Sequence, residues 1–298
     1  INSCALLDFS RSRRFMPYEL DASLAAPSGT YNGAISASND TIVVGSWQTN
    51  AANVYSKVGS NWEVEASLSA DGTNELFGMS VALFGTTLAV GAPNAGGSYI
   101  GAVYLLRHNG TAWARTQVLT ESTSNTNSLF GWHVALGGQR TLAVGSYGAY
   151  SFEGRVFAYR LDASGSAILG SKQVLRASDA SPGAYFGWSL ALAADGTALA
   201  VGAVRADGVR GRAYLFERVA DEGGAAAALW NETTRLLDPQ AHPGDRFGTS
   251  VALAAARRSG NATLTLVCGT KHKSIGGASH NGGAFLYVRD REGETPTN

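Results

Sequence analysis

Four acidic residues recur at comparable places in the sequence and are the first candidates for catalysis. They are Asp71, Glu121, Asp179 and Asp245, and each shortly precedes a phenylalanine–glycine pair. Two carboxylates close to a scissile bond are what glycoside hydrolysis requires. These four fall in segments that connect strands, where acids commonly stabilise turns. The segments expected to lie innermost contain no carboxylate, namely residues 33–36, 79–83, 132–136, 188–192 and 249–253. Hydrolysis is therefore the least favoured function.

The other reactive side chains form no catalytic arrangement. His133 stands where other copies of a repeat have serine, and we expect it to be structural. The histidines of the segment 271–280 lie beside lysines, whose ammonium groups would repel a metal cation. No Ser-His-Asp set, thiolate nucleophile or glycine-rich phosphate loop can be assembled. The sequence predicts that this chain is not an enzyme.

A repeated pattern predicts the elements that position these side chains. Four copies begin at Phe77-Gly78, Phe130-Gly131, Phe186-Gly187 and Phe247-Gly248, and a degenerate copy begins at Tyr31-Asn32-Gly33. Each continues with a segment like Leu88-Ala89-Val90-Gly91 and then one like Gly101-Ala102-Val103-Tyr104. A period of about 50 residues made of short strands predicts a radial array of small sheets.

We predict an all-β fold, a five-bladed β-propeller of four-stranded antiparallel blades. The blades are expected near residues 31–68, 77–119, 130–175, 186–237 and 247–288. The last copy has no fourth strand, while a surplus strand at residues 14–24 has no inner three before it. We expect this N-terminal strand to complete the last blade and close the ring. The propeller would span residues 14–290, between an N-terminal extension (1–13, with Cys4) and a polar tail (291–298).

The composition excludes several classes of partner. The chain has 23 Lys and Arg against 23 Asp and Glu, so its formal net charge is zero. No basic stripe suggests nucleic acid or an anionic membrane surface, and no apolar run of about 20 residues suggests a membrane span. The chain begins at Ile1 rather than Met. Either a signal segment has been removed or this is part of a longer chain.

Four Asn-x-Ser/Thr sequons predict N-linked glycans and an extracellular protein. They begin at Asn39, Asn109, Asn231 and Asn261, all expected toward one end of the ring. The loops at the opposite end carry none. Cys4 and Cys268 fall in segments assigned to the same blade, so we predict a disulfide between them in an oxidising compartment. The alternative is a buried thiol at Cys268 and a free or intermolecular Cys4.

The repeated motifs resemble the FG-GAP repeat, which occurs in the propeller of integrin α subunits and in other extracellular proteins. The copy from Phe77 to Leu105, with Gly91-Ala92-Pro93, is the most similar. The resemblance implies an extracellular recognition or adhesion module. Integrin propellers have seven such repeats, whereas we count five. Many FG-GAP repeats also hold calcium in loops rich in aspartate, but Asp40 and Asp195 each stand alone here. We expect no calcium site and no other cofactor.

Aromatic residues in the loops between second and third strands are the candidate ligand contacts. They are Trp47, Tyr99, Tyr147, Tyr150 and Phe152. Such rings anchor protein partners or stack on sugars, although some could fold back over neighbouring blades. The loops differ from copy to copy, which favours one protein-binding face over a lectin with repeated glycan sites. We expect Trp132 and Trp188, which begin inner strands, to belong to the core between blades.

Overall fold

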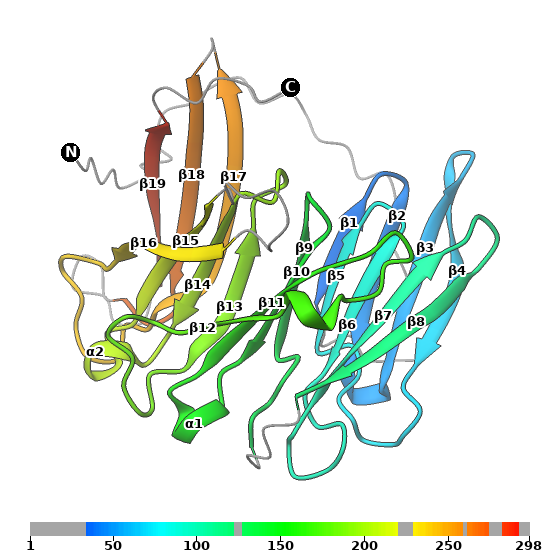
Figure 1. Cartoon of the computed structure of the whole chain (residues 1–298), viewed down its shortest axis with the longest axis horizontal. Coiled ribbons are helices and arrows are strands. Elements are labelled where there is room, and N and C mark those ends of the chain that lie inside the picture. The colour runs from blue at the N-terminus through cyan, green and yellow to red at the C-terminus, as the bar shows by residue number, and fades with distance from the viewer. Residues whose placement is uncertain (1–33, 122–126, 220–228, 259–260, 274–281, 292–298) are drawn as a thin grey trace.

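The computed structural model describes residues 34–121, 127–219, 229–258, 261–273 and 282–291, which form five antiparallel sheets (Figure 1). The first sheet contains β1 (Ile35–Ser38), β2 (Thr41–Ser46), β3 (Ala51–Val58) and β4 (Asn61–Ser69). The second contains β5 (Ser80–Phe84), β6 (Thr87–Ala92), β7 (Ala102–His108) and β8 (Trp113–Thr120). The third contains β9 (His133–Gly137), β10 (Thr141–Ser146), β11 (Arg155–Arg160) and β12 (Gln173–Leu175).

The fourth sheet contains β13 (Phe186–Leu192), β14 (Ala198–Ala203), β15 (Arg212–Val219) and β16 (Leu229–Leu236). The fifth contains β17 (Phe247–Arg258), β18 (Asn261–Thr270) and β19 (Gly283–Arg291). Four one-turn helices lie in loops: η1 (Trp47–Thr49), α1 (Ala149–Phe152), η2 (Leu169–Ser171) and α2 (Ala206–Val209). The all-β architecture of propeller-like blades is confirmed. The closing strand, residues 14–24, lies outside the described residues, so closure of the ring and the number of blades stay predictions.

The second strand of each sheet is the centre of its core. β10 and β14 are buried along their whole length, and their sequences combine Ala, Leu, Val and Gly. Strands covered on both faces need no alternation of apolar and polar residues. Small residues also let neighbouring sheets approach closely. These segments therefore form strands that pack on both sides.

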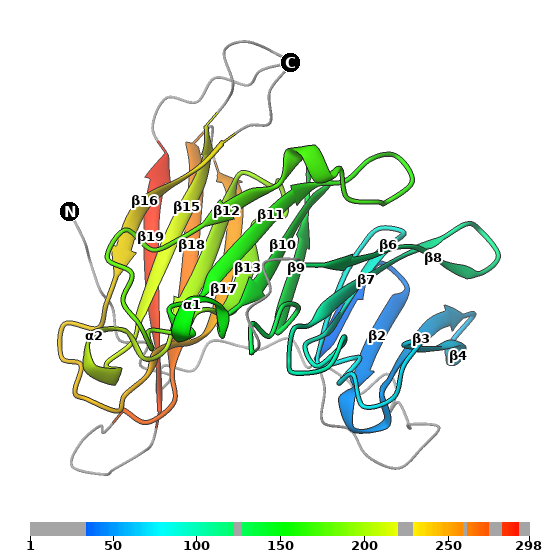
Figure 2. The ribbon, with the colours of Figure 1, turned by 60° about the horizontal axis from the view of Figure 1, so that its bottom comes forward.

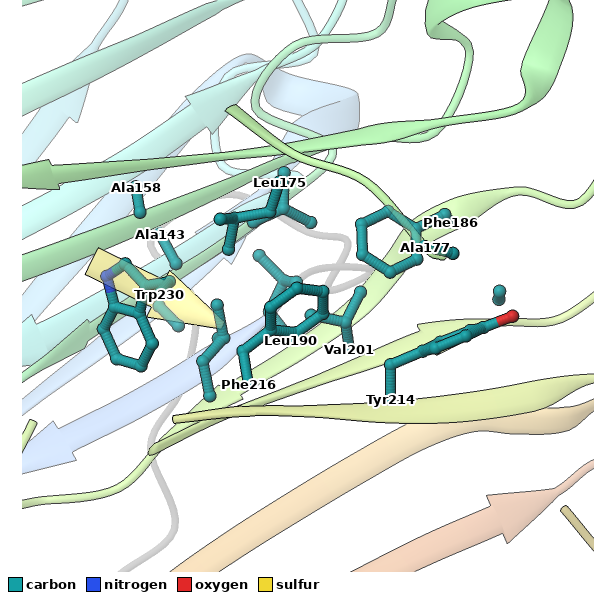
Figure 3. Close-up of a cluster of buried hydrophobic side chains, with 14 of the residues drawn as sticks. Ala143, Ala158, Leu175, Ala177, Phe186, Leu190, Val201, Tyr214, Phe216 and Trp230 are labelled. Atoms are coloured by element: carbon teal, nitrogen blue, oxygen red, sulfur yellow. The ribbon is translucent and has the colours of Figure 1, made fainter. Parts of the chain in front are cut away.

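The phenylalanine that begins each repeat fills the interface between two sheets. Phe77, Phe130, Phe186 and Phe247 are at most 1% exposed. Figure 3 shows Phe186 beside Ala177, in a cluster that joins Ala143 and Ala158 of the third sheet to Tyr214 of the fourth. Phe186 meets Tyr214 edge to face, with ring centroids 5.4 Å apart. Burying an aromatic ring at each interface contributes roughly 1.5–3 kcal/mol.

Backbone contacts fix the loop end of each interface. Gly101, Gly154 and Gly211, which precede third strands, form parallel bridges with Phe130, Phe186 and Phe247 of the next sheet. The three glycines have φ of 94°, 91° and 85°, values that residues with a Cβ adopt rarely. A Cβ at Gly154 would lie 2.0 Å from the carbonyl oxygen of Phe186. The loops between second and third strands are therefore held against the following sheet.

The sheets follow one another around an axis lined by their first strands. β1 packs on β5, β5 on β9, β9 on β13, and β13 on β17. No comparable packing joins β17 to β1 within the described ranges. Both views show the first sheet and the fifth at opposite ends of the series (Figures 1 and 2).

Candidate functional site

Five aromatic side chains gather at the loop end of the third and fourth sheets. This aromatic cluster consists of Trp132, Tyr147, Phe152, Tyr185 and Trp188. Tyr147 is its centre, with ring centroids 4.8 Å from Trp132, 5.0 Å from Trp188 and 4.9 Å from Tyr185. Trp132 and Trp188 also meet each other at 5.0 Å. All five side chains are partly exposed. The cluster is therefore a surface feature and not a buried core.

Left-handed backbone conformations aim two of these rings into the cluster. Phe152 has φ of 61° and Tyr185 has φ of 62°. The backbone N–H of Tyr185 donates a hydrogen bond of 2.9 Å to the carbonyl oxygen of Phe152. This bond ties the α1 loop of the third sheet to the start of the fourth. The cluster is thus ordered by the same backbone contacts that join the two sheets.

An uncharged cavity of about 240 Å³ lies beside the cluster, near the axis. It is lined by residues at the first strands of four sheets: Met79, Trp132, His133, Trp188, Ser189, Leu190, Thr249, Ser250 and Val251. Trp132 and Trp188 belong to both the cavity and the aromatic cluster. Partly exposed rings beside an uncharged cavity can receive an apolar or aromatic group of a ligand.

His133 is the one titratable side chain that lines this cavity. Burial lowers the pKa of His133 to about 4, so its imidazole is neutral at pH 7. Its Nδ1 atom is buried and has no hydrogen-bond partner within the described part of the chain. The serines at the same position of two other sheets behave differently. Ser80 and Ser189 donate to the carbonyl oxygens of Gly131 and Gly248 in the next sheet, at 3.0 and 2.8 Å.

One arginine borders the cluster, and a second lies beside the neighbouring Tyr150. The Arg205 guanidinium lies 5.0 Å from the Tyr185 ring centroid and donates a hydrogen bond of 3.2 Å to the Tyr185 hydroxyl. Arg155 lies 4.1 Å from the centroid of the Tyr150 ring and forms an ion pair with Glu153 at 2.6 Å. The site therefore combines aromatic surface with one cationic group, Arg205, at its rim.

Comparison with known families agrees with this architecture. Residues 62–106 and 170–216 match the family model described as FG-GAP repeat. The chain contains FG-GAP repeats. The resemblance predicted from the motifs is thereby confirmed at these two segments. No curated protein sequence matches the chain. Each matched segment begins near the outer strand of one sheet and ends in the third strand of the next, so an FG-GAP repeat here straddles two sheets.

The loops between second and third strands bring together only part of the predicted ligand-contact set. Tyr147 and Phe152 lie in the aromatic cluster. Tyr150 is 44% exposed and packs against Arg155, outside the cluster. Tyr99 is 47% exposed on the loop of the second sheet, and Trp47 is partly buried in η1 of the first. The structure does not test which of these residues contact a ligand.

The sequence interpretation was wrong for two residues and missed a third. Trp132 and Trp188 are not inter-sheet core, because the axial cavity leaves both rings partly exposed. Tyr185 was not predicted. It stands immediately before Phe186, where other FG-GAP copies have leucine or arginine (residues 76, 129 and 246). An aromatic residue at that repeated position was the available signal.

The four loop acids are used within the fold. Asp71 pairs with Arg115 at 2.5 Å, and Glu121 pairs with Lys172 at 3.3 Å. Asp245 accepts a hydrogen bond of 2.8 Å from the backbone N–H of His242. These contacts agree with the expectation that the acids stabilise loops.

Asp179 holds the most extensive of these contacts. It accepts a hydrogen bond of 2.8 Å from the Tyr214 hydroxyl and pairs with Arg212 and, at 3.4 Å, with Arg235. Burial opposes its ionisation, but the Tyr214 hydrogen bond and the arginine charges outweigh burial and lower the pKa of Asp179.

Metal ligands are not grouped in the described sheets. Across residues whose placement is given, no three His, Cys, Asp or Glu side chains are arranged to hold a metal ion. Asp195 accepts hydrogen bonds from the backbone N–H and hydroxyl of Thr197, at 3.0 and 2.7 Å, and so closes a turn. The prediction that no calcium binds stays a prediction. In the same ranges no helix has the length and apolar composition needed to cross a membrane.

The residues predicted to carry glycans or to form a disulfide lie in different environments. Asn39 and Asn109 are exposed in turns, and Asn231 is exposed in β16. Asn261 begins β18. Glycosylation at all four stays a prediction. Cys268 is 0% exposed in the core shared by the fourth and fifth sheets, and burial raises the pKa of its thiol to about 12. Cys4 lies outside the described residues, so the disulfide also stays a prediction.

Proposed function

We propose that this chain is a non-catalytic extracellular recognition module that binds a protein partner through the aromatic cluster and the adjoining cavity. The main observation in support of this proposal is the contact of Tyr147 with four partly exposed rings at the loop end. Aromatic side chains bury large apolar areas on binding and dominate the energetics of protein interfaces. FG-GAP repeats are found in integrin-like extracellular proteins, which supports this class of function.

The asymmetry of the site supports a protein ligand. The position of Tyr147 is occupied by Pro93 in the second sheet and by Val204 in the fourth. The position of Trp132 and Trp188 is occupied by Met79 and Thr249. One aromatic site on a ring of otherwise different loops fits a single asymmetric partner. A lectin built from repeats would present similar residues on several sheets.

A glycan ligand is the second candidate. Partly exposed Trp and Tyr rings beside an uncharged cavity also suit stacking against a sugar. One binding experiment distinguishes a protein ligand from a glycan ligand. The glycosylated protein is screened against a glycan array and against extracellular proteins, with and without a calcium chelator. A retained protein partner without a glycan signal supports the proposal, whereas a specific glycan alone favours the second candidate. Binding that chelation abolishes would contradict the prediction that no calcium binds.

Variants locate the binding surface. Tyr147→Ala and Trp188→Ala should weaken binding by about tenfold or more, as expected for buried aromatic anchors. Phe84→Ala is the matched control, because Phe84 is an exposed aromatic residue at the end of β5, outside the cluster and outside the predicted contact set. Circular dichroism would verify that each variant is folded. Unchanged binding by both cluster variants would exclude this site.

A further inference from the structure

Arg205 is an exposed arginine at the rim of the aromatic cluster, and within the described residues it forms no ion pair with a carboxylate. The other described arginines at the loop end of the third and fourth sheets are each paired with Glu153, Asp179 or Asp207. They are Arg155, Arg176, Arg210, Arg212 and Arg235. The charge of Arg205 is therefore available to a ligand, unlike those of its neighbours.

The aromatic cluster itself holds Arg205 in place. Its guanidinium lies 5.0 Å from the Tyr185 ring centroid, and its Nη1 donates a hydrogen bond of 3.2 Å to the Tyr185 hydroxyl. The backbone N–H of Arg205 donates to the carbonyl oxygen of Ala184 at 3.1 Å. A guanidinium has five N–H donors in a planar fork. The donors that Tyr185 does not use can bind a carboxylate with two parallel hydrogen bonds.

The acids of this end of the molecule are engaged elsewhere or absent. Asp207, two residues after Arg205, pairs with Arg210 and Arg212 at 3.5 and 3.4 Å. No Asp or Glu lines the axial cavity. The two segments that link described elements at this end, residues 122–126 and 274–281, contain no Asp or Glu. A carboxylate for Arg205 is therefore expected from a ligand.

The axial cavity sets the second requirement for a ligand. Trp188 lines this cavity and stacks on Tyr185, with centroids 6.0 Å apart and ring planes 16° apart. One ring therefore separates the cavity from Arg205. The cavity volume is about 240 Å³, and a cavity of about 150 Å³ is enough for benzene. A charged group would lose its hydration there without gaining a partner, so the cavity favours a neutral aromatic side chain.

We propose that the partner of this site is a protein segment that carries an aromatic side chain and, within about three residues of it, a carboxylate that pairs with Arg205. The proposal rests on the proposed function, because it names the chemistry of the partner at that same site. An extended chain spans about 3.3–3.6 Å per residue, so three residues reach about 10 Å, enough to pass from Trp188 across Tyr185 to Arg205. The rings supply contact area, and Arg205 determines specificity.

A library of random peptides displayed on phage is the probe, selected on the full chain. Peptides that bind the parent but not Trp188→Ala should be enriched in an aromatic residue with Asp or Glu nearby. Arg205→Ala should weaken their binding by about tenfold or more in fluorescence anisotropy, because charge-assisted hydrogen bonds are lost. Arg160→Ala is the matched control. Arg160 is also exposed and has no carboxylate partner among the described residues, but it lies at the opposite end of the third sheet.

A charge exchange separates direct contact from support of the Tyr185 ring. Arg205→Glu should abolish binding of the selected peptides. Replacing the peptide carboxylate by lysine should restore binding to Arg205→Glu and weaken binding to the parent. An arginine that only positions Tyr185 would not produce this exchange. Thermal melts of each variant verify that the fold is retained.

The outcomes distinguish this inference from the proposed function. Peptides that require Trp188 but bind Arg205→Ala as tightly as the parent would overturn the role of Arg205 and leave the proposed site intact. A selection that yields no peptide dependent on Trp188 would overturn both. Binding to an acidic glycan on an array, lost in Arg205→Ala, would assign the anion to a glycan and overturn the assignment to a protein segment.

Discussion

The hydroxyl group of Ser189 donates a hydrogen bond of 2.8 Å to the backbone carbonyl oxygen of Gly248, across the interface between the fourth and fifth sheets. Ser80 makes the same bond to Gly131 two interfaces earlier, between the second and third sheets. Both serines are at most 4% exposed. The first strands of the second and fourth sheets therefore each contribute a polar contact to an interface that is otherwise apolar.

Replacing serine by alanine at this position should lower stability only in the sheets where the serine makes this hydrogen bond. Ser189→Ala should lower the free energy of unfolding by about 1 kcal/mol, because it leaves a buried carbonyl oxygen without its donor. Ser250→Ala is the matched control and should leave it almost unchanged. Urea denaturation followed by tryptophan fluorescence measures both. Equal losses would contradict the exposure of Ser250.

The contacts of Asp179 predict a stability that falls in acid. The folded-state pKa of Asp179 is lowered, so its stabilising contribution is present above the unfolded value of about 3.9 and is lost as the pH falls through the folded value. Asp179→Asn should therefore have a lower Tm than the parent at pH 7, and the difference should shrink below about pH 4. Thermal melts between pH 2.5 and 7 measure it. Asp40→Asn, at an exposed turn, is the control. A constant difference across this range would contradict the prediction.

His133 predicts a second pH dependence, at higher pH. Its folded pKa of about 4 lies below the ordinary histidine value, so the unfolded chain takes up the proton first. Stability should therefore fall as the pH drops from about 6.5 to about 4. His133→Ser should remove this component, because serine at this position donates to the next sheet elsewhere in the chain.

The control for His133 is His242→Ser, since His242 is exposed. Urea midpoints at pH 7 and pH 5 compare the variants. An NMR titration of the His133 imidazole measures its pKa directly. Protonation of His133 near the ordinary pKa would show that water or a charged group reaches its ring.

The predicted bridge between Cys4 and Cys268 has a clear thermal signature. If it forms, Cys4→Ser should lower the melting temperature. A disulfide restricts the unfolded chain and thereby stabilises the folded state by roughly 2–4 kcal/mol. A reducing agent should lower the parent in the same way. An unchanged melting temperature, with one thiol per chain released only in denaturant, would identify Cys268 as a free buried thiol. That outcome fits its 0% exposure.

Much of the fold was predictable because its signals are local and repeated. Each phenylalanine–glycine pair marks the start of an inner strand, and each Val-Gly segment ends a buried second strand. These patterns follow from burial on both faces and from close backbone approach, so they appear directly in the residue types. The position of the loop acids was predictable for the same reason.

The aromatic cluster was only partly predictable, because it depends on the spacing of the sheets. Trp132 and Trp188 would be buried if the inner strands converged tightly on the axis. The observed cavity leaves them partly exposed instead. Tyr185 stands at a position that is left-handed in the other copies as well, where Leu76, Leu129 and Arg246 occur. Its aromatic side chain was therefore a usable signal, whereas the exposure of the two tryptophans depends on inter-sheet geometry that the sequence pattern does not encode.

The offset between repeat and sheet affects how such a chain can lengthen. Each segment that matches the FG-GAP repeat runs from the outer strand of one sheet into the third strand of the next. A tandem gene duplication with these boundaries would add a complete interface between two sheets, with both of the surfaces that pack against each other. The duplicated segment would then pack on the existing sheets through residues that already form such interfaces. Blade number can therefore change during evolution without a new packing solution being found each time.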